Sequence, residues 1–461
     1  MLRKLVAFVA AGLLWGGGPA CATSSILIVS SSPVTPGKFR LLEELARPQG
    51  FTLDVRYVVK LPSDVDGKLF AGHQLVLLDT PRDHIRDAVR ARLARAWPEL
   101  RIPAVWLHTT APAQQGLSEP LLHRLHAYYI IGSGKNIDIF FRTLAAYFKG
   151  RPWESLPGPI IFPKSAIYHP QAPQIVFPDT AAYFAWKGVD SEKRPPVVAI
   201  AFHQQTISSE QTLFVDDLIR RIEAAGAIAL PFYAPVMGKT VLQEVLAPGG
   251  RLMADVLINT QIMLNPEGRR AEFDALGIPV VQAMPYRRGD EAEWRADEQG
   301  VTLMDVPFYL AQSEYTGVTD IQIAAAQDEV ADQPRAIEAQ AASVVNKALN
   351  MVKLQRKAKA DKKVTMFFWN YPAGEKNLSA SYLNLLNSFD VTLKALREQG
   401  YTTTVPSELV LKLQLQRLLA PFYQPANDQR ELESLVRDGL AGLVPLEEYK
   451  QWLNSLPNSV R

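Results

Sequence analysis

The chain has 461 residues, of which 48% are hydrophobic and 21% charged, and its formal net charge is +2. This length suits roughly two to four domains of ordinary globular composition, each with a core of its own. The near-neutral balance argues against a nucleic-acid-binding protein, because such a protein gathers basic residues on one face.

The first 22 residues have the features of an export signal. Arg3 and Lys4 precede an apolar run at residues 5–15, which is too short to cross a bilayer as a helix. Small residues at Ala20-Cys21-Ala22 fit a cleavage site, so we expect residues 1–22 to be removed and the mature protein to be periplasmic. An uncleaved anchor and a lipid-modified Cys21 are the alternatives.

Cys21 is the only cysteine of the chain. If the signal is removed, the mature protein has neither disulfides nor a cysteine-ligated zinc site. No later segment is long and apolar enough to predict a transmembrane helix in the mature chain. We therefore expect an exported protein that is stabilised by its hydrophobic cores alone.

Residues 23–150 are predicted to form a first α/β domain, because strand and helix patterns alternate along them. Strands are expected at residues 26–30, 52–58, 75–79, 104–108 and 128–131. Helices are expected at residues 38–46, 83–96 and 136–148. Such alternation is typical of a doubly wound, mostly parallel sheet of the Rossmann-like or flavodoxin-like kind.

The rest of the chain is predicted to hold three further segments. Residues 151–195 are rich in proline and indicate a connector with a small β element. Residues 196–345 indicate a second α/β domain, which opens with a strand at 197–202 and a helix at 211–225. Residues 346–461 indicate the start of a third α/β domain with a helical end. Within it we expect strands at 363–369 and 402–405, a helix at 379–399, and further helices over 406–455.

Several enzyme signatures are incomplete. His123 and His126 have helical spacing, but Arg124 stands between them and no carboxylate follows closely, so we favour a solvated helix face and predict no metal site. Gly132-Ser133-Gly134-Lys135 and Gly238-Lys239-Thr240 look like the end of a phosphate loop. Both lack the earlier glycine that the loop requires, since tyrosine stands there. We therefore predict a turn and a helix cap, and no ATP site.

The most informative stretch runs from Asn370 to Asn384, after an apolar strand and at the expected start of a helix. Loops at the carboxyl ends of parallel strands are where α/β proteins bind ligands. Asn377 or Ser379 would cap the helix, whose free N–H groups would face an anionic group. On these grounds alone, a ligand-binding loop and a capped loop without a ligand are equally good interpretations.

This stretch resembles the pattern N-Y-P-x-x-E-x-N-x-x-A-S-Y-L-N of the large subunit of cobaltochelatase (CobN) and of the related magnesium chelatase H subunit. Ala166-Ile167-Tyr168-His169-Pro170 resembles the family's "YHP" element, and Phe202-His203 and residues 277–283 resemble its second α/β unit. The resemblance covers most of residues 165–461. The family's subunits are much longer, so we expect this chain to be an N-terminal fragment.

The resemblance implies a ligase that forms nitrogen–metal bonds by inserting Co²⁺ into a corrin, as in cobalamin biosynthesis. Such a subunit binds the tetrapyrrole, a corrin or porphyrin, and works with ATPase-type chelatase subunits and the remaining part of its own chain. Insertion needs a base for the pyrrole protons and weak ligands that pass the metal on. Carried over by position, the resemblance implies Glu375 and His203 as catalytic residues, and as tetrapyrrole-binding residues it implies Tyr168, His169, Asn370, Tyr371 and Asn377.

Two other functions remain open at this stage. An exported relative that binds a tetrapyrrole such as haem, or removes its metal during uptake, would need no ATP, and the export signal favours it. A solute-binding protein with two α/β lobes would fit the first two domains but leaves residues 362–461 unexplained. For the chelatase interpretation, we expect the fragment alone to be inactive and Glu375, His203 and His169 to face a shared inter-domain cleft.

Overall fold

A computed structural model describes most of the chain, and its ranges are 24–30, 36–108, 113–189, 194–238, 240–318, 320–328, 330–367, 371–374, 376–380, 382–423, 429–458 and 460–461. The chain divides into two compact units, Met1–Val352 and Lys353–Arg461. The predicted signal, residues 1–22, lies outside the described residues. Within those residues no helix has the length and apolar character needed to cross a membrane.

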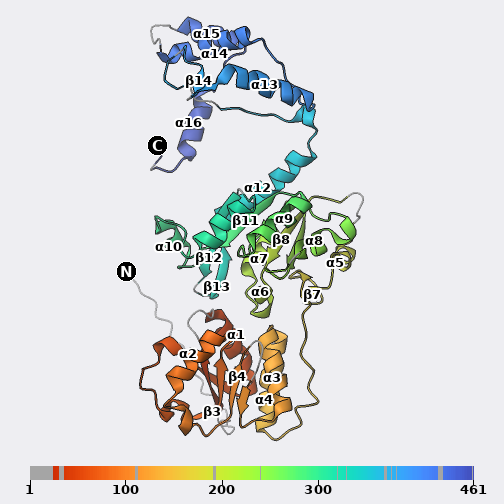
Figure 1. Cartoon of the computed structure of the whole chain (residues 1–461), viewed down its shortest axis with the longest axis vertical. Helices are drawn as coiled ribbons and strands as arrows, with labels where there is room; N and C mark the ends of the chain where they lie inside the picture. Colours follow the sequence, from red (N-terminus) through yellow and green to blue (C-terminus); the bar gives the residue numbers. More distant parts are fainter. Residues whose placement is uncertain are drawn as a thin grey trace, which may run out of the picture. The chain divides into compact units, whose positions relative to one another are not determined.

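The first sheet of the larger unit has the strand order β2-β1-β3-β4-β5 (Figure 1). Its strands are β1 (Ser24–Ser30), β2 (Phe51–Tyr57), β3 (His73–Asp79), β4 (Ala104–Leu107) and β5 (Ala113–Gln115). All neighbours are parallel except β4 and β5. Helices α1 (Pro36–Ala46), α3 (Glu119–Ile131) and α4 (Gly134–Phe148) cover one face, and α2 (Asp83–Leu93) covers the other.

The strands of this sheet are apolar on both sides because helices cover both faces. Along β1, Ile26 and Ile28 pack into one core, while Leu27 and Val29 pack into the core of the opposite face. Short 3-10 turns complete both layers. The turn η1 (Arg47–Gln49) lies against α1 and α4, and the layer of α2 includes η2 (Val58–Lys60), η3 (Gly67–Phe70) and η4 (Trp97–Glu99).

The second sheet has the order β13-β12-β11-β10-β8-β9-β6-β7. Its central parallel strands are β8 (Val197–Phe202), β9 (Ile228–Tyr233), β10 (Val256–Asn259), β11 (Val280–Pro285) and β12 (Asp320–Asp328). Antiparallel strands flank them at both edges, namely β6 (Ala166–Tyr168), β7 (Val176–Phe177) and β13 (Gln333–Ala336).

Helices cover both faces of the second sheet as well. On one face lie α7 (Leu213–Ala224) and α12 (Glu338–Arg356), and on the other lie α5 (Thr180–Lys187), α8 (Val241–Leu246) and α9 (Pro266–Leu276). The remaining helical segments are α6 (Gln204–Ser208), η5 (Pro248–Gly250), α10 (Glu291–Ala296), η6 (Val306–Ala311) and α11 (Gln312–Tyr315). The predicted α/β class with parallel sheets is confirmed.

The unit Lys353–Arg461 differs from the α/β start that the sequence suggested. Its described residues form η7 (Lys359–Asp361), a two-stranded antiparallel ribbon, β14 (Ser379–Ala380) with β15 (Leu383–Asn384), and the helices α13 (Leu385–Glu398), α14 (Glu408–Tyr423), α15 (Gln429–Arg437) and α16 (Leu446–Ser455). Residues 363–367 and 402–405 are not strands. A strand needs a neighbour for its backbone groups, and no described segment pairs with these two.

Three other expectations are corrected. Residues 128–131 end helix α3, because Leu121, Leu125 and Tyr128 continue one buried helical face. Strands β6 and β7, expected in a separate connector, extend the second sheet, because β6 pairs with β9 and β7 pairs with β6. The expected helix at 379–399 begins at α13, where the Asn384 side chain accepts the Asn387 N–H at 3.1 Å.

Candidate functional site

The carboxyl ends of β8 and β10 mark the point where the second sheet changes winding direction. From β8 the chain passes through α7 on one face to β9, and from β9 it passes through α8 on the other face to β10. Ligands of α/β proteins bind at such a point, because two loops diverge there and leave a crevice. His203 directly follows β8 and therefore lies at this position.

His203 is held by the loop after β10. Its Nε2 accepts the backbone N–H of Ile262 at 3.3 Å, which places the ring proton on Nδ1. Burial, with a smaller contribution from the positive charge of Arg287, lowers the pKa of His203. The imidazole is therefore neutral at neutral pH, as a base or metal ligand must be.

A second group of polar residues lies around helix α7. His169, next to β6, is buried, and its Nδ1 accepts the Gln171 N–H at 3.2 Å. Its Nε2 then carries the proton and faces Oε1 of Glu223 at 3.2 Å. Lys187 also bonds to Glu223, and the His169 ring lies 5.0 Å from the ring of Trp186. Burial, followed by the charge of Lys187, lowers the pKa of His169.

Tyr168 donates its phenolic proton to Oδ1 of Asp216 at 2.9 Å, and Thr212 donates to Oδ2 of the same carboxylate at 2.7 Å. Burial raises the pKa of Asp216 above its ordinary value, and burial likewise raises the pKa of Tyr168. The phenolic O–H of Tyr168 is thus donated to Asp216, while the lone pairs of its oxygen remain able to accept a hydrogen bond.

Tyr168 and His169 line a cleft of about 380 Å³ between the two sheets of the larger unit. Ser133 and Lys135 form a second wall, and Glu210 and Thr212, which follow α6, form a third. The volume lies near the lower end of the range of roughly 300–1,000 Å³ found for ligand sites. The cleft therefore suits one edge or side group of a large ligand.

Comparison with known proteins places the chain among the chelatases. Residues 126–461 match the CobN/Magnesium Chelatase family. The chain belongs to this family. The magnesium-chelatase subunit ChlH of Oryza sativa subsp. indica is 24% identical over 301 residues, which are 59% of this chain and 21% of that protein. The aerobic cobaltochelatase subunit CobN of Sinorhizobium sp is 24% identical over 360 residues, which are 73% of this chain and 27% of that protein.

The fold agrees with a solved chelatase structure. The catalytic subunit of cobaltochelatase from Mycobacterium tuberculosis matches with a TM-score of 0.61 and 19% identity, over 94% of this chain and 35% of that chain. At this identity the match shows a shared fold. The present chain spans between about a fifth and about a third of the chelatase subunits named here. The family resemblance inferred from the sequence is confirmed.

The structure brings some of the residues implied by the chelatase family together. Tyr168 and His169 share the cleft, whereas His203 does not line it. Both ring nitrogens of His169 are bonded within the protein, so this ring shapes the cleft and has no nitrogen left to bind a metal. The predicted roles of these residues stay predictions.

The predicted site residues of the smaller unit are described in part. Asn370 and Glu375 lie outside the described residues. Tyr371 is exposed, and Asn377 bonds through its side chain to the Ala373 carbonyl at 3.1 Å. The expected cleft shared by Glu375, His203 and His169 also stays a prediction.

Reasoning from the sequence missed the roles of Ser133, Lys135, Glu210 and Thr212 in the cleft. The signal for the first two was visible as the Gly132–Lys135 motif, which was interpreted as a plain turn. No local pattern indicated Glu210 or Thr212, because their place in the cleft depends on how the two sheets meet.

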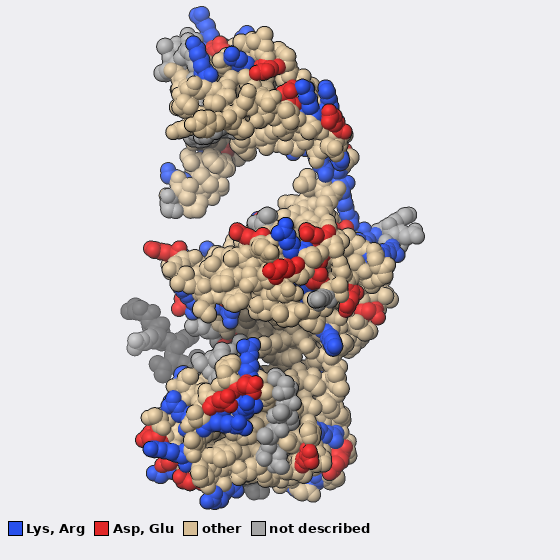
Figure 2. Space-filling model, in the orientation of Figure 1, with Lys and Arg blue, Asp and Glu red and all other residues tan. Residues whose placement is uncertain are grey.

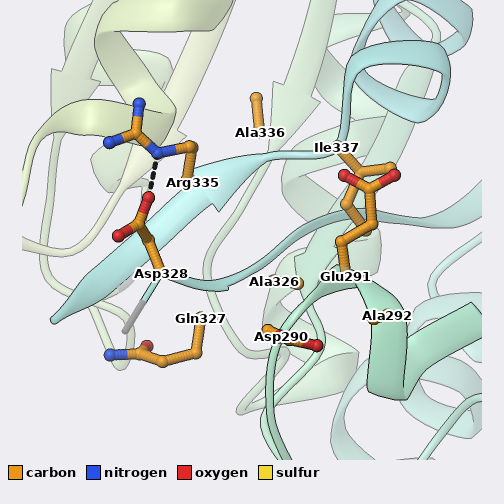
Figure 3. Close-up of a pocket in the computed structure, with 9 residues that line it drawn as sticks. All are labelled: Asp290, Glu291, Ala292, Ala326, Gln327, Asp328, Arg335, Ala336 and Ile337. Carbon is orange, nitrogen blue, oxygen red and sulfur yellow. Dashed lines mark hydrogen bonds and ion pairs between the residues drawn. The ribbon is translucent and has the colours of Figure 1, made fainter. Parts of the chain in front are cut away.

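A second cavity of about 310 Å³ lies between the β12–β13 hairpin and the start of α10 (Figure 3). Asp290 caps α10 by accepting the Glu293 N–H at 2.8 Å. Asp328 pairs with Arg335 and accepts the Ala331 N–H at 2.7 Å. These two carboxylates are already bonded within the protein, so the cavity is a weaker candidate than the cleft at Tyr168.

Proposed function

We propose that this chain is a tetrapyrrole-binding portion of the large subunit of a cobaltochelatase-type enzyme, which inserts Co²⁺ into a corrin. One observation carries the proposal. The Tyr168-His169 pair, which belongs to a family-like sequence element, lines a cleft whose other walls combine polar and apolar side chains. The choice of Co²⁺ follows the resemblance of residues 370–384 to the CobN pattern.

The cleft offers a route for the protons that leave a macrocycle during metal insertion. The Tyr168 oxygen has lone pairs that can accept a proton released from the ring, and its own proton is already donated to Asp216. Burial raises the pKa of Asp216, which makes this carboxylate a better proton acceptor than an exposed one. The pair can therefore draw a proton away from the ring while the cleft holds one edge of it.

The proposed partners are the remaining part of the large subunit and ATPase-type chelatase subunits. The unit Lys353–Arg461 supports the first of these, since its buried hydrophobic residues in the described part are Leu385, Leu415 and Leu435 alone. Phe367, Trp452 and many other large apolar side chains of this unit are exposed. Figure 2 shows broad surfaces without charged side chains on this unit (upper part of the view). Exposed apolar surface of this extent is typical of a protein–protein contact.

The binding proposal is tested by titrating the chain with a metal-free corrin, protoporphyrin IX and haem while following their visible absorption. We expect saturable binding of the metal-free corrin, and no Co²⁺ insertion by the chain alone, because the ATPase-type subunits and most of the large subunit are missing from the assay. The absence of binding for all three macrocycles would contradict the proposal. Preferential binding of haem would favour the second function, described next.

The second candidate function is an exported family member that binds haem or removes its metal during uptake. The sequence of residues 1–22 favours it, because its charged, apolar and small-residue segments are those of an export signal. We expect the protein recovered from the periplasm to begin at Thr23. N-terminal sequencing checks this directly, and an intact Met1 on the exported protein would contradict it.

A further inference from the structure

The Gly132–Lys135 segment, which imitates part of a phosphate loop, docks on the second sheet's domain. The Ser133 N–H donates to the Ser208 carbonyl at 2.6 Å, and the Gly134 N–H donates to Oε1 of Glu210 at 2.6 Å. A Cβ at Gly132 would lie 2.5 Å from the Ser208 oxygen, and one at Gly134 would lie 2.2 Å from Oε1 of Glu210. Position 132 therefore requires glycine, because its φ is 72° and the close atom belongs to the backbone, whereas a side chain at position 134 would displace the Glu210 carboxylate from the Gly134 N–H.

This docking accounts for the glycines of the Gly132–Lys135 segment, so no bound phosphate is needed to explain them. The negative charge of Glu210 faces the amino end of α4, where free backbone N–H groups and the helix dipole compensate it. Glu210 itself has a left-handed backbone, with φ 54°, which aims its side chain across the junction. The contact fixes the position of the residue that follows, Lys135, at the cleft wall.

Lys135 is the one lysine or arginine among the residues that line the cleft. Among the described residues it has no carboxylate partner, whereas Glu210 is bonded to Gly134 and the Tyr168 and His169 side chains are neutral. An exposed lysine that is held at a cleft wall attracts an anionic group on the ligand that enters.

We propose that Lys135 binds a carboxylate on the periphery of the tetrapyrrole and thereby makes the cleft selective for ligands with free acid side chains. This inference rests on the proposed function. It goes further by assigning a ligand group to a residue that the family-like motifs do not include.

The test compares protoporphyrin IX, which has two free carboxylates, with its dimethyl ester, using the full chain in both cases. For Lys135→Gln, we expect an affinity loss of about tenfold for the diacid, as removal of a charged hydrogen bond predicts, and no change for the diester. Lys135→Arg should restore most of the affinity. Lys149→Gln, at the other end of the same helix, is the matched control and should leave both affinities unchanged.

The outcomes separate this inference from the function on which it rests. If the wild-type chain binds both ligands equally and Lys135→Gln changes neither affinity, the role of Lys135 is wrong while macrocycle binding stands. An equal loss for diacid and diester would also overturn it, because that result indicates a structural effect. If the wild-type chain binds neither porphyrin, this inference is wrong, whereas the proposed function is decided separately by the titration with the metal-free corrin.

Discussion

Replacing Glu272 by glutamine is expected to lower the free energy of unfolding by about 3–5 kcal/mol. Glu272 and Arg269 form an ion pair on α9 in which both side chains are almost fully buried, at 4% and 5% exposure. The change keeps the shape of the side chain but leaves the Arg269 cation buried without a counter-charge. Leaving one buried charge without its partner lowers the free energy of unfolding by far more than the intact pair raises it.

The pair also holds the loop after β9 and the start of α8 in place through hydrogen bonds. Glu272 accepts the Leu242 N–H at 2.9 Å, and Arg269 donates to the carbonyls of Pro235 and Val236 at 2.9 and 2.8 Å. Urea denaturation measures the effect. Glu291→Gln breaks an exposed pair with Arg295 and should change stability by less than about 1 kcal/mol. Equal losses for the two variants would contradict the buried pair.

Replacing Gly132 by alanine is expected to cost about 3 kcal/mol of unfolding free energy. Its backbone, with φ 72° and ψ −154°, lies in a region that is essentially restricted to glycine, and strain there costs about 1–3 kcal/mol. The added Cβ would also overlap the Ser208 carbonyl, and overpacking of this kind costs a further amount of about 1–3 kcal/mol.

Gly150→Ala separates the two contributions. Gly150 also has a positive φ, of 62°, but nothing lies within 4 Å of the position of its Cβ. Its substitution should cost about 1–2 kcal/mol, from backbone strain alone. The difference between the two variants in urea denaturation measures the contact with Ser208. Equal losses would contradict the docking of the Gly132–Lys135 segment.

The sequence predicted most of the larger unit because its strands are short apolar runs between amphipathic helices. The prediction failed at residues 128–131, where two tyrosines and two isoleucines look like a strand but complete the buried face of α3. It also failed at residues 363–367, since apolar character alone does not supply the neighbouring strand that a sheet requires.

The candidate site was predicted in part. Tyr168 and His169 were found through their resemblance to a family element, and the structure places both at the cleft. Tyr168 donates its proton to Asp216, which is 48 positions away, and His169 donates to Glu223, which is 54 positions away. No local pattern in the sequence indicated these hydrogen bonds. The same holds for Glu210, which meets Gly134 across 76 positions.

The central claim is that the cleft at Tyr168, His169 and Lys135 binds one edge of a tetrapyrrole. The most direct measurement is a crystal structure of the chain with zinc protoporphyrin, in which the anomalous scattering of zinc locates the ring. We predict a zinc peak outside the mouth of the cleft, with the nearest ring edge between Tyr168 and Lys135. A zinc peak beside the cavity at Asp290, or beside His203 with the cleft empty, would contradict this account.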